Sequence, residues 1–218
     1  MELTKEQIKY IDHHLENEGI KYWDIRIEMI DHIVSDIEKN AISIDFKKEL
    51  ATSLKRIGSK GTLKNINTIG WKNTNAKYRR EYGKGIVSFF KSTKNIVIST
   101  FSVLIYYLIA EYFSFKIFKN ISFALIFLPL LTFLFQSIKQ IGKKYGRSVN
   151  LDYGTTYFLF AFLMIGTPIQ FLKYTSETNQ KWILLILIPL YFIATYSGFK
   201  LYKKAIHKIE KMKSEMKL

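Results

Sequence analysis

Hydrophobic residues follow two different patterns along this chain. Up to about residue 57 they recur every three or four positions, which is the spacing of one face of an α-helix. From about residue 95 they form long, nearly continuous runs. Runs of about 20 apolar residues are typical of helices that cross a hydrocarbon core roughly 30 Å thick. The pattern predicts an all-α membrane protein in which a small three-helix domain precedes four transmembrane helices.

The periodic part predicts three short helices. The first covers residues 4–18, where Thr4 and Gln7 have the spacing of a capping box and Gly19 is placed to end the helix. The third begins after Asp45, a residue type that caps helix starts, and ends at Gly58. Short helices with one apolar face each bury those faces against one another or against a partner, so we expect residues 1–58 to form one cytosolic domain.

The second helix is predicted over residues 22–40. Its apolar residues recur at intervals of three and four and are expected on one buried face: Trp23, Ile27, Ile30, Val34 and Ile37.

The segment 59–94 has a weaker helical pattern. Residues 59–85 contain four glycines and several Asn and Thr residues, so we expect a basic tether. Residues 86–94 combine Val, Ile and Phe with two lysines, which predicts either an interfacial elbow helix or an extension of the first span.

Four apolar runs have spanning length and define a transmembrane domain over residues 95–200. We place the spans at 95–113, 120–138, 153–173 and 181–200. The third has the shortest apolar centre, because Gly166, Pro168 and Gln170 interrupt its outer end. Residues 201–218 are expected to form a basic cytosolic helical tail.

Charge is distributed unevenly. The net charge is +15, yet residues 1–54 carry 12 acidic against 7 basic residues, and the basic surplus lies beside the apolar runs. This position is typical of groups held at anionic lipid headgroups, so the partners we expect include membrane lipids and exclude nucleic acid.

Orientation follows from the same charges. The connection between the second and third spans holds Lys139, Lys143, Lys144 and Arg147, whereas the other two connections are less basic. The positive-inside rule then predicts a multi-pass protein of the inner membrane with both termini in the cytoplasm.

Chemistry has little support in the sequence. There is no cysteine, no Gly-rich phosphate loop, no G-x-S-x-G elbow and no H-E-x-x-H zinc pattern. We therefore expect no enzymatic activity and no cofactor.

One cluster of charged residues resembles a binding site. The second helix carries acidic residues and a histidine at helical spacing, and we expect this set to bind a protein partner: Asp24, Glu28, Asp31, His32 and Glu38. An alternative is a metal site in which Glu28, Asp31 and His32 join His13 from the first helix.

Two polar residues of the spans are candidates for a transport pathway. Glu111 lies near the outer end of the first span, where it is solvated or paired with Lys116 or Lys173. Gln136 lies near the inner end of the second span and fits a hydrogen bond between helices. Pro129, Pro168 and Pro189 add kinks that can shape a cavity.

The run from Ile8 to Ile57, above all IRIEMIDHIVSDIE from Ile25 to Glu38, resembles the short helical domain of the HAAS or permease-prefix type found ahead of membrane segments in bacterial proteins. The resemblance covers about a quarter of the chain and implies a cytosolic docking or signalling element beside a membrane anchor or permease. It assigns no catalytic residue.

The sequence thus predicts a non-enzymatic accessory or regulatory membrane protein whose cytosolic domain docks another membrane or cytosolic protein. The alternative is a small transporter, or a subunit of a transport or translocation complex.

Overall fold

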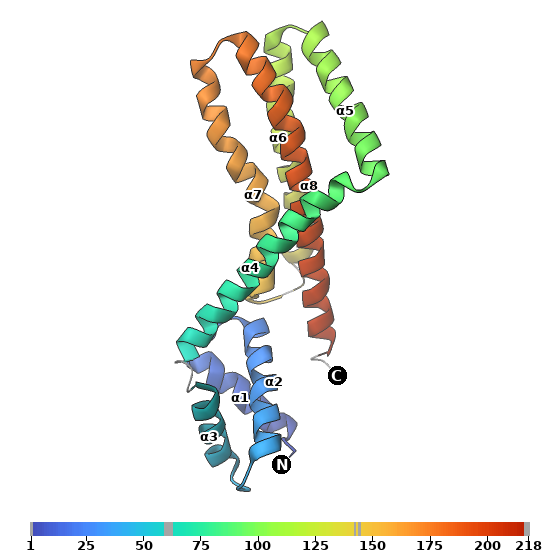
Figure 1. Ribbon diagram of the computed structural model, residues 1–218. Coiled ribbons are helices and arrows are strands. Elements are labelled where there is room, and N and C mark those ends of the chain that lie inside the picture. Colours follow the sequence, from blue (N-terminus) through green and yellow to red (C-terminus); the bar gives the residue numbers. More distant parts are fainter. Residues whose placement is uncertain (1, 59–62, 142, 144, 216–218) are drawn as a thin grey trace. The chain divides into compact units, whose positions relative to one another are not determined.

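A computed structural model describes residues 2–58, 63–141, 143 and 145–215, which form helices and their connections (Figure 1). Their bounds are α1 (Lys5–Asn17), α2 (Trp23–Asn40), α3 (Phe46–Gly58), α4 (Leu63–Phe90), α5 (Thr93–Tyr112), α6 (Phe115–Ile141), α7 (Val149–Phe171), the 3-10 turn η1 (Leu172–Tyr174) and α8 (Glu177–Glu215). The chain divides into two compact units. The first comprises the residues up to Ala76 together with Tyr145–Asn150, and the second comprises Lys77–Lys144 and Leu151–Leu218.

The three predicted N-terminal helices are confirmed. At the start of α1, the Gln7 backbone N–H donates to Thr4 Oγ1 (3.2 Å), and the Thr4 backbone N–H donates to Gln7 Oε1 (2.9 Å). Gly19 follows α1 with a φ of +92°, a left-handed conformation in which a Cβ would be strained. Asp45 Oδ1 accepts from the Lys47 N–H at 3.0 Å and so caps α3.

The predicted apolar face of α2 was partly wrong. Besides Trp23 and Ile37, the buried apolar residues are Ile25, Met29 and Ile33, whereas Ile27, Ile30 and Val34 are only half-buried. Both α1 and α3 pack against α2, so its contact surface is broader than a single stripe and is centred on a different line of residues.

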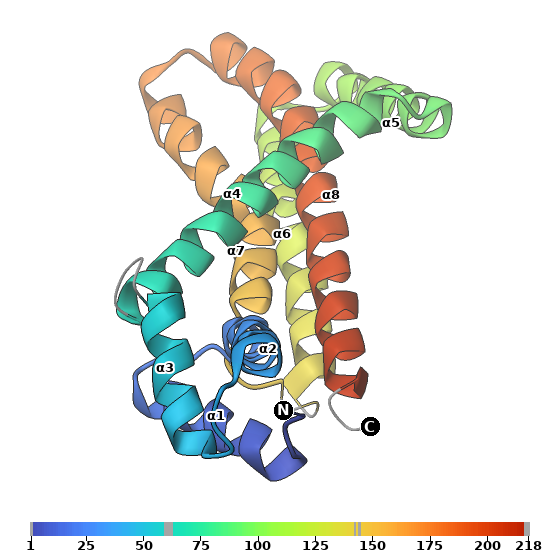
Figure 2. The ribbon, with the colours of Figure 1, turned by 60° about the horizontal axis from the view of Figure 1, so that its bottom comes forward.

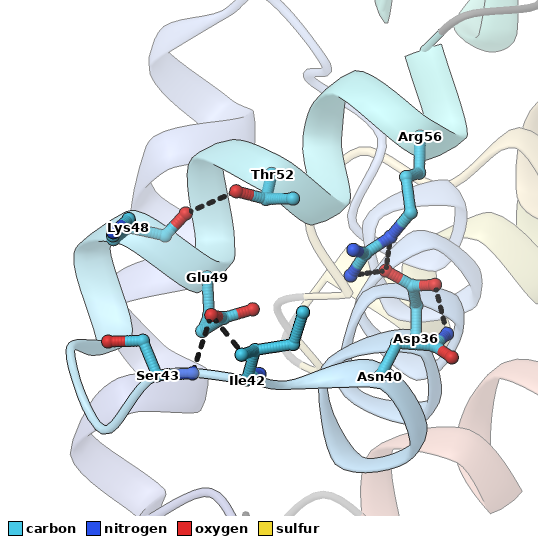
Figure 3. A network of polar contacts seen from close by, with 8 residues as sticks. All are labelled: Asp36, Asn40, Ile42, Ser43, Lys48, Glu49, Thr52 and Arg56. Atoms are coloured by element: carbon cyan, nitrogen blue, oxygen red, sulfur yellow. Dashed lines mark hydrogen bonds and ion pairs between the residues drawn. The ribbon is translucent and has the colours of Figure 1, made fainter.

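Two carboxylates fix the connection between α2 and α3 (Figure 3). Glu49 is buried and accepts hydrogen bonds from the backbone N–H groups of Ser43 (2.9 Å) and Ile42 (3.3 Å). Asp36 accepts from Arg56 through Nη2 (2.8 Å) and Nε (3.0 Å), and from Asn40 at 2.9 Å. Burial alone would raise the pKa of Asp36, but these hydrogen bonds and the Arg56 charge outweigh it and hold the pKa below its ordinary value of 3.8.

The tether predicted over residues 59–85 was wrong from residue 63 onwards, because these residues belong to the continuous helix α4; residues 59–62 lie outside the described part of the chain. Packing outweighs the low propensity of its glycines. In the second unit, Tyr82 of α4 packs against Tyr157 of α7, with ring centroids 5.5 Å apart and ring planes tilted by 40°. Gly85 lies so close to Ser197 of α8 that a Cβ would be 3.2 Å from the Ser197 Cβ. This glycine therefore permits a close approach of α4 to α8.

The chain turns between α4 and α5, so the first span is not extended backwards. Ser92 has extended backbone angles, and its Oγ accepts from the Asn95 N–H, which caps the start of α5. Residues 86–90 are the end of α4 rather than a separate elbow helix.

Within the described ranges, four helices are long and apolar enough to cross a membrane: α5, α6, α7 with η1, and α8. From Leu151 onwards α7 belongs to the second unit, as do the other three. The four predicted spans are confirmed as helices. Despite Gly166 and Pro168, α7 is continuous to Phe171. The tail predicted over residues 201–218 continues α8 as far as Glu215, and the last three residues lie outside the description.

Helix α8 is the central element of the second unit. It packs beside α6, as both views show (Figures 1 and 2), and the Tyr191 hydroxyl donates to the Ile126 carbonyl of α6 at 2.8 Å. Gly198 faces α7, and a Cβ added to this glycine would lie only 2.9 Å from the Phe158 Cα. Helix α5 is the least buried span. In its most apolar stretch of 18 residues 11% are buried, against 44% in the corresponding stretch of α8.

We expect Gly198→Ala to destabilise the second unit by about 1–3 kcal/mol, because the new methyl group meets backbone atoms of α7 that have no room to move aside. The measurement is the thermal unfolding of the detergent-solubilised protein by circular dichroism. Gly166→Ala is the control, because a Cβ on Gly166 meets no atom within 4 Å. Equal midpoints for the two variants would contradict close packing of α7 on α8.

The Asp36–Arg56 pair gives a prediction in pH. Because the folded-state pKa of Asp36 is lowered, the pair stabilises the fold above about pH 3.8, and this contribution disappears as the pH falls through the folded-state pKa. We expect Asp36→Asn to cost roughly 0.5–1 kcal/mol near neutral pH and nothing once Asp36 is protonated. Urea unfolding of both proteins between neutral pH and about pH 3 measures the difference, and a constant difference throughout would refute the assignment.

Candidate functional site

The candidate residues on α2 fall into two groups, one buried and one exposed. Asp24 is 2% exposed and lies inside the first unit. Its carboxylate accepts four hydrogen bonds: from Ser148 Oγ (2.7 Å), the Val149 N–H (3.0 Å), the Asn150 N–H (3.0 Å) and Asn150 Nδ2 (2.7 Å). The expectation that Asp24 contacts a partner was therefore wrong, because its oxygens are already occupied within the protein.

Asp24 caps the start of α7. The first backbone N–H groups of a helix have no partner within the helix, and the helix dipole favours a negative charge there. A second contact supports the arrangement, since the Trp23 N–H donates to the Arg147 carbonyl at 3.2 Å. Gly146, with a φ of +72°, lies against the Trp23 ring. Sequence reasoning missed this site because its two halves are more than 120 residues apart.

The remaining α2 residues form an exposed face. Glu28, Asp31, His32 and Glu38 are all exposed, and none makes a hydrogen bond or ion pair with any residue that the structure describes. We call this set the acidic face of α2. Three carboxylates at helical spacing repel one another and favour a cationic neighbour.

Several other carboxylates of the first unit have partners. Arg26 is buried, and its Nε lies 2.6 Å from Asp12 while its Nη1 lies 3.3 Å from Glu16. Arg26 Nη1 also donates to the Ile20 carbonyl at 3.0 Å, which fixes the turn between α1 and α2. Asp36 and Glu49 are bound within the α2–α3 connection (Figure 3). The acidic face of α2 differs from these carboxylates because it serves no contact inside the described protein.

The four residues of the alternative metal site are not brought together. His13 lies 3.9 Å from Glu16 on its own helix. Within the described ranges, no group of three or more His, Asp or Glu side chains is arranged to hold a metal ion.

The two transport candidates lie at opposite ends of antiparallel helices, Glu111 at the end of α5 and Gln136 near the end of α6. Glu111 pairs with Lys181 of α8 at 2.8 Å, and not with Lys116 or Lys173 as expected. Gln136 has no hydrogen-bond partner among the residues that the structure describes. These positions do not form a common site.

In comparisons with known proteins, no family model, no curated protein and no solved structure matches the chain.

Removing the Asp24 carboxylate tests its structural role. We expect Asp24→Ala to destabilise the protein by about 2–3 kcal/mol, because the buried donors at Ser148, Val149 and Asn150 lose a charged acceptor. Asp31→Ala, on the exposed face of the same helix, should change stability by no more than about 0.5 kcal/mol. Thermal unfolding of the two variants in the same detergent is the measurement, and similar losses for both would refute the distinction.

Proposed function

We propose that this chain is a non-enzymatic accessory or regulatory protein of a bacterial inner membrane whose N-terminal helices dock a protein partner through the acidic face of α2. The observation that carries the proposal is the state of Glu28, Asp31 and Glu38. They are exposed and without partners among the described residues, whereas other carboxylates on α1–α3 hold that unit together.

Membrane insertion is supported by the four apolar helices of the second unit. Large apolar side chains on α5, among them Phe101, Leu104 and Ile105, are exposed and suit a hydrocarbon environment. The basic residues near the end of α6 and along the end of α8 favour cytoplasmic positions for both termini. The acidic face of α2 would then be presented to the cytoplasm.

The partner is best described by its chemistry. Opposite charges on two surfaces raise the rate of encounter and exclude partners of like charge. A surface rich in lysine or arginine, on a cytosolic protein or on the cytoplasmic side of another membrane protein, fits the acidic face. The resemblance of Ile25–Glu38 to the permease-prefix type agrees with such a role. The transport alternative has no comparable support in the described residues, because Glu111 is paired with Lys181 and lies at the opposite end of the helices from Gln136.

The test is copurification from native membranes after mild crosslinking and gentle detergent extraction. We expect Glu28→Lys with Asp31→Lys to lose about tenfold or more of a partner that the wild type retains, because two attractive charges become repulsive. The control is Glu2→Lys with Glu18→Lys, which makes the same change of net charge at exposed positions outside the acidic face.

Salt supplies a second criterion. Interactions between exposed charges are screened over about 8–10 Å near physiological ionic strength, so the same partner should dissociate as salt is raised. An identical set of copurified proteins for the wild type and the charge-reversed variant would refute docking through this face.

A further inference from the structure

The second unit contains an apolar pocket of about 630 Å³ between α5, α6 and α8. On α5 its lining follows one helical stripe, from Asn95 through Ile98, Ser102 and Ile105 to Ile109. At 1.5 Å per residue this stripe is roughly 21 Å long, more than half of a hydrocarbon core of roughly 30 Å. The volume falls in the range of about 300–1,000 Å³ that ligand pockets occupy.

The lining suits a hydrocarbon chain better than a polar substrate. Opposite α5, aliphatic side chains of Leu125 and Ile188 cover the wall. The Tyr106 hydroxyl is bonded to Ser122 at 2.6 Å, and the Ser102 hydroxyl to the carbonyl of Ile98 in its own helix at 2.9 Å. These hydroxyl groups have protein partners, so the middle of the pocket behaves as an apolar surface.

One end of the pocket is basic. Asn95 and Tyr196 line it where α4 turns into α5. Two lysines lie next to these residues: Lys94 directly precedes Asn95, and Lys200 follows Tyr196 by one turn of α8. The Lys200 ammonium lies 4.9 Å from the centre of the Tyr196 ring, which places a positive charge at this end of the pocket. Neither lysine has a carboxylate partner among the described residues.

We propose that this pocket binds one anionic phospholipid, with an acyl chain along α5 and the headgroup phosphate between Lys94 and Lys200. An apolar slot whose lining at one end, Asn95 and Tyr196, adjoins two lysines complements a molecule with a hydrocarbon tail and an anionic head. The proposal rests on the membrane insertion proposed above. In that orientation the basic end meets the cytoplasmic leaflet, where anionic lipids attract basic residues.

The test uses the full-length protein in phosphatidylcholine vesicles that contain a trace of photoreactive phospholipid with a diazirine at the end of one acyl chain. One preparation carries phosphatidylglycerol as the reactive lipid and the other carries phosphatidylcholine. We expect phosphatidylglycerol to label pocket peptides of α5, α6 and α8 at least about fivefold more strongly, since one basic residue near a charged lipid contributes about that factor.

Two variants separate the head site from the tail site. Lys94→Gln with Lys200→Gln should lower phosphatidylglycerol labelling to the level of phosphatidylcholine. Ser102→Phe should reduce labelling by both lipids, because the ring fills the slot. The charge-matched control is Lys139→Gln with Lys203→Gln, two exposed lysines whose ammonium groups lie over Phe135 and Phe199, outside the pocket lining; it should retain the preference.

Equal labelling by the two lipids overturns the proposal, as does a preference that survives loss of Lys94 and Lys200, or a pocket crosslinked to a second copy of the chain. Circular dichroism of each variant confirms its folding, and Lys94→Gln alone serves if the double variant does not fold. Flotation of the vesicles reports membrane insertion separately. Labelling uses purified protein, so its failure leaves docking through the acidic face of α2 untouched.

Discussion

The carboxylate of Asp24 accepts four hydrogen bonds from Ser148, Val149 and Asn150, and it does so with almost no exposure to solvent. A buried carboxylate is tolerated only where donors compensate for the water it loses. Here the donors are the N–H groups and side chains at the start of α7, which in turn need an acceptor. This mutual requirement brings Tyr145–Asn150 into the first unit, although the sequence around them belongs to the second.

Asp24 and Arg26 are both engaged in contacts inside the protein, so the residues of α2 available to a partner are the exposed ones. Arg26 binds Asp12, Glu16 and the Ile20 carbonyl, so the N-terminal turns of α2 are fixed on one side by charge. The opposite side keeps Glu28, Asp31 and Glu38 in solvent. Internal pairing of some carboxylates and exposure of others on one helix separates the part that stabilises the fold from the part available to a partner.

In the second unit, close backbone packing and a hydrogen bond to a backbone carbonyl hold the helices around α8. Gly198, together with Gly85 on α4, permits close approach of helix backbones, and Tyr191 donates a hydrogen bond to the backbone of α6. Helices in a hydrocarbon environment gain little from burying apolar surface, so close packing and such hydrogen bonds carry their association. Helix α5 lacks close contacts of this kind along much of its length, and the pocket lies beside it.

The sequence by itself determined the helices and the two kinds of hydrophobic pattern. Capping residues such as Thr4 and Asp45 bind backbone groups no more than three residues away, so the helix starts were predicted correctly. Membrane-spanning helices such as α6 and α8 are recognisable from their apolar composition alone, so they were predicted correctly too. Local information failed where distant residues decide the outcome. The glycines of α4 suggested a tether, but the packing of Tyr82 on Tyr157 and the approach to Ser197 maintain a helix there.

Only the tertiary structure distinguished Asp24 from Glu28 and Asp31. All three are acidic residues at helical spacing on one element, and sequence spacing assigns them the same role. The difference arises because Ser148–Asn150, more than 120 residues away, meet Asp24 and no other member of the set. Whether a charge is buried depends on which distant donors reach it, and the spacing of residues along a single helix contains no information about those donors.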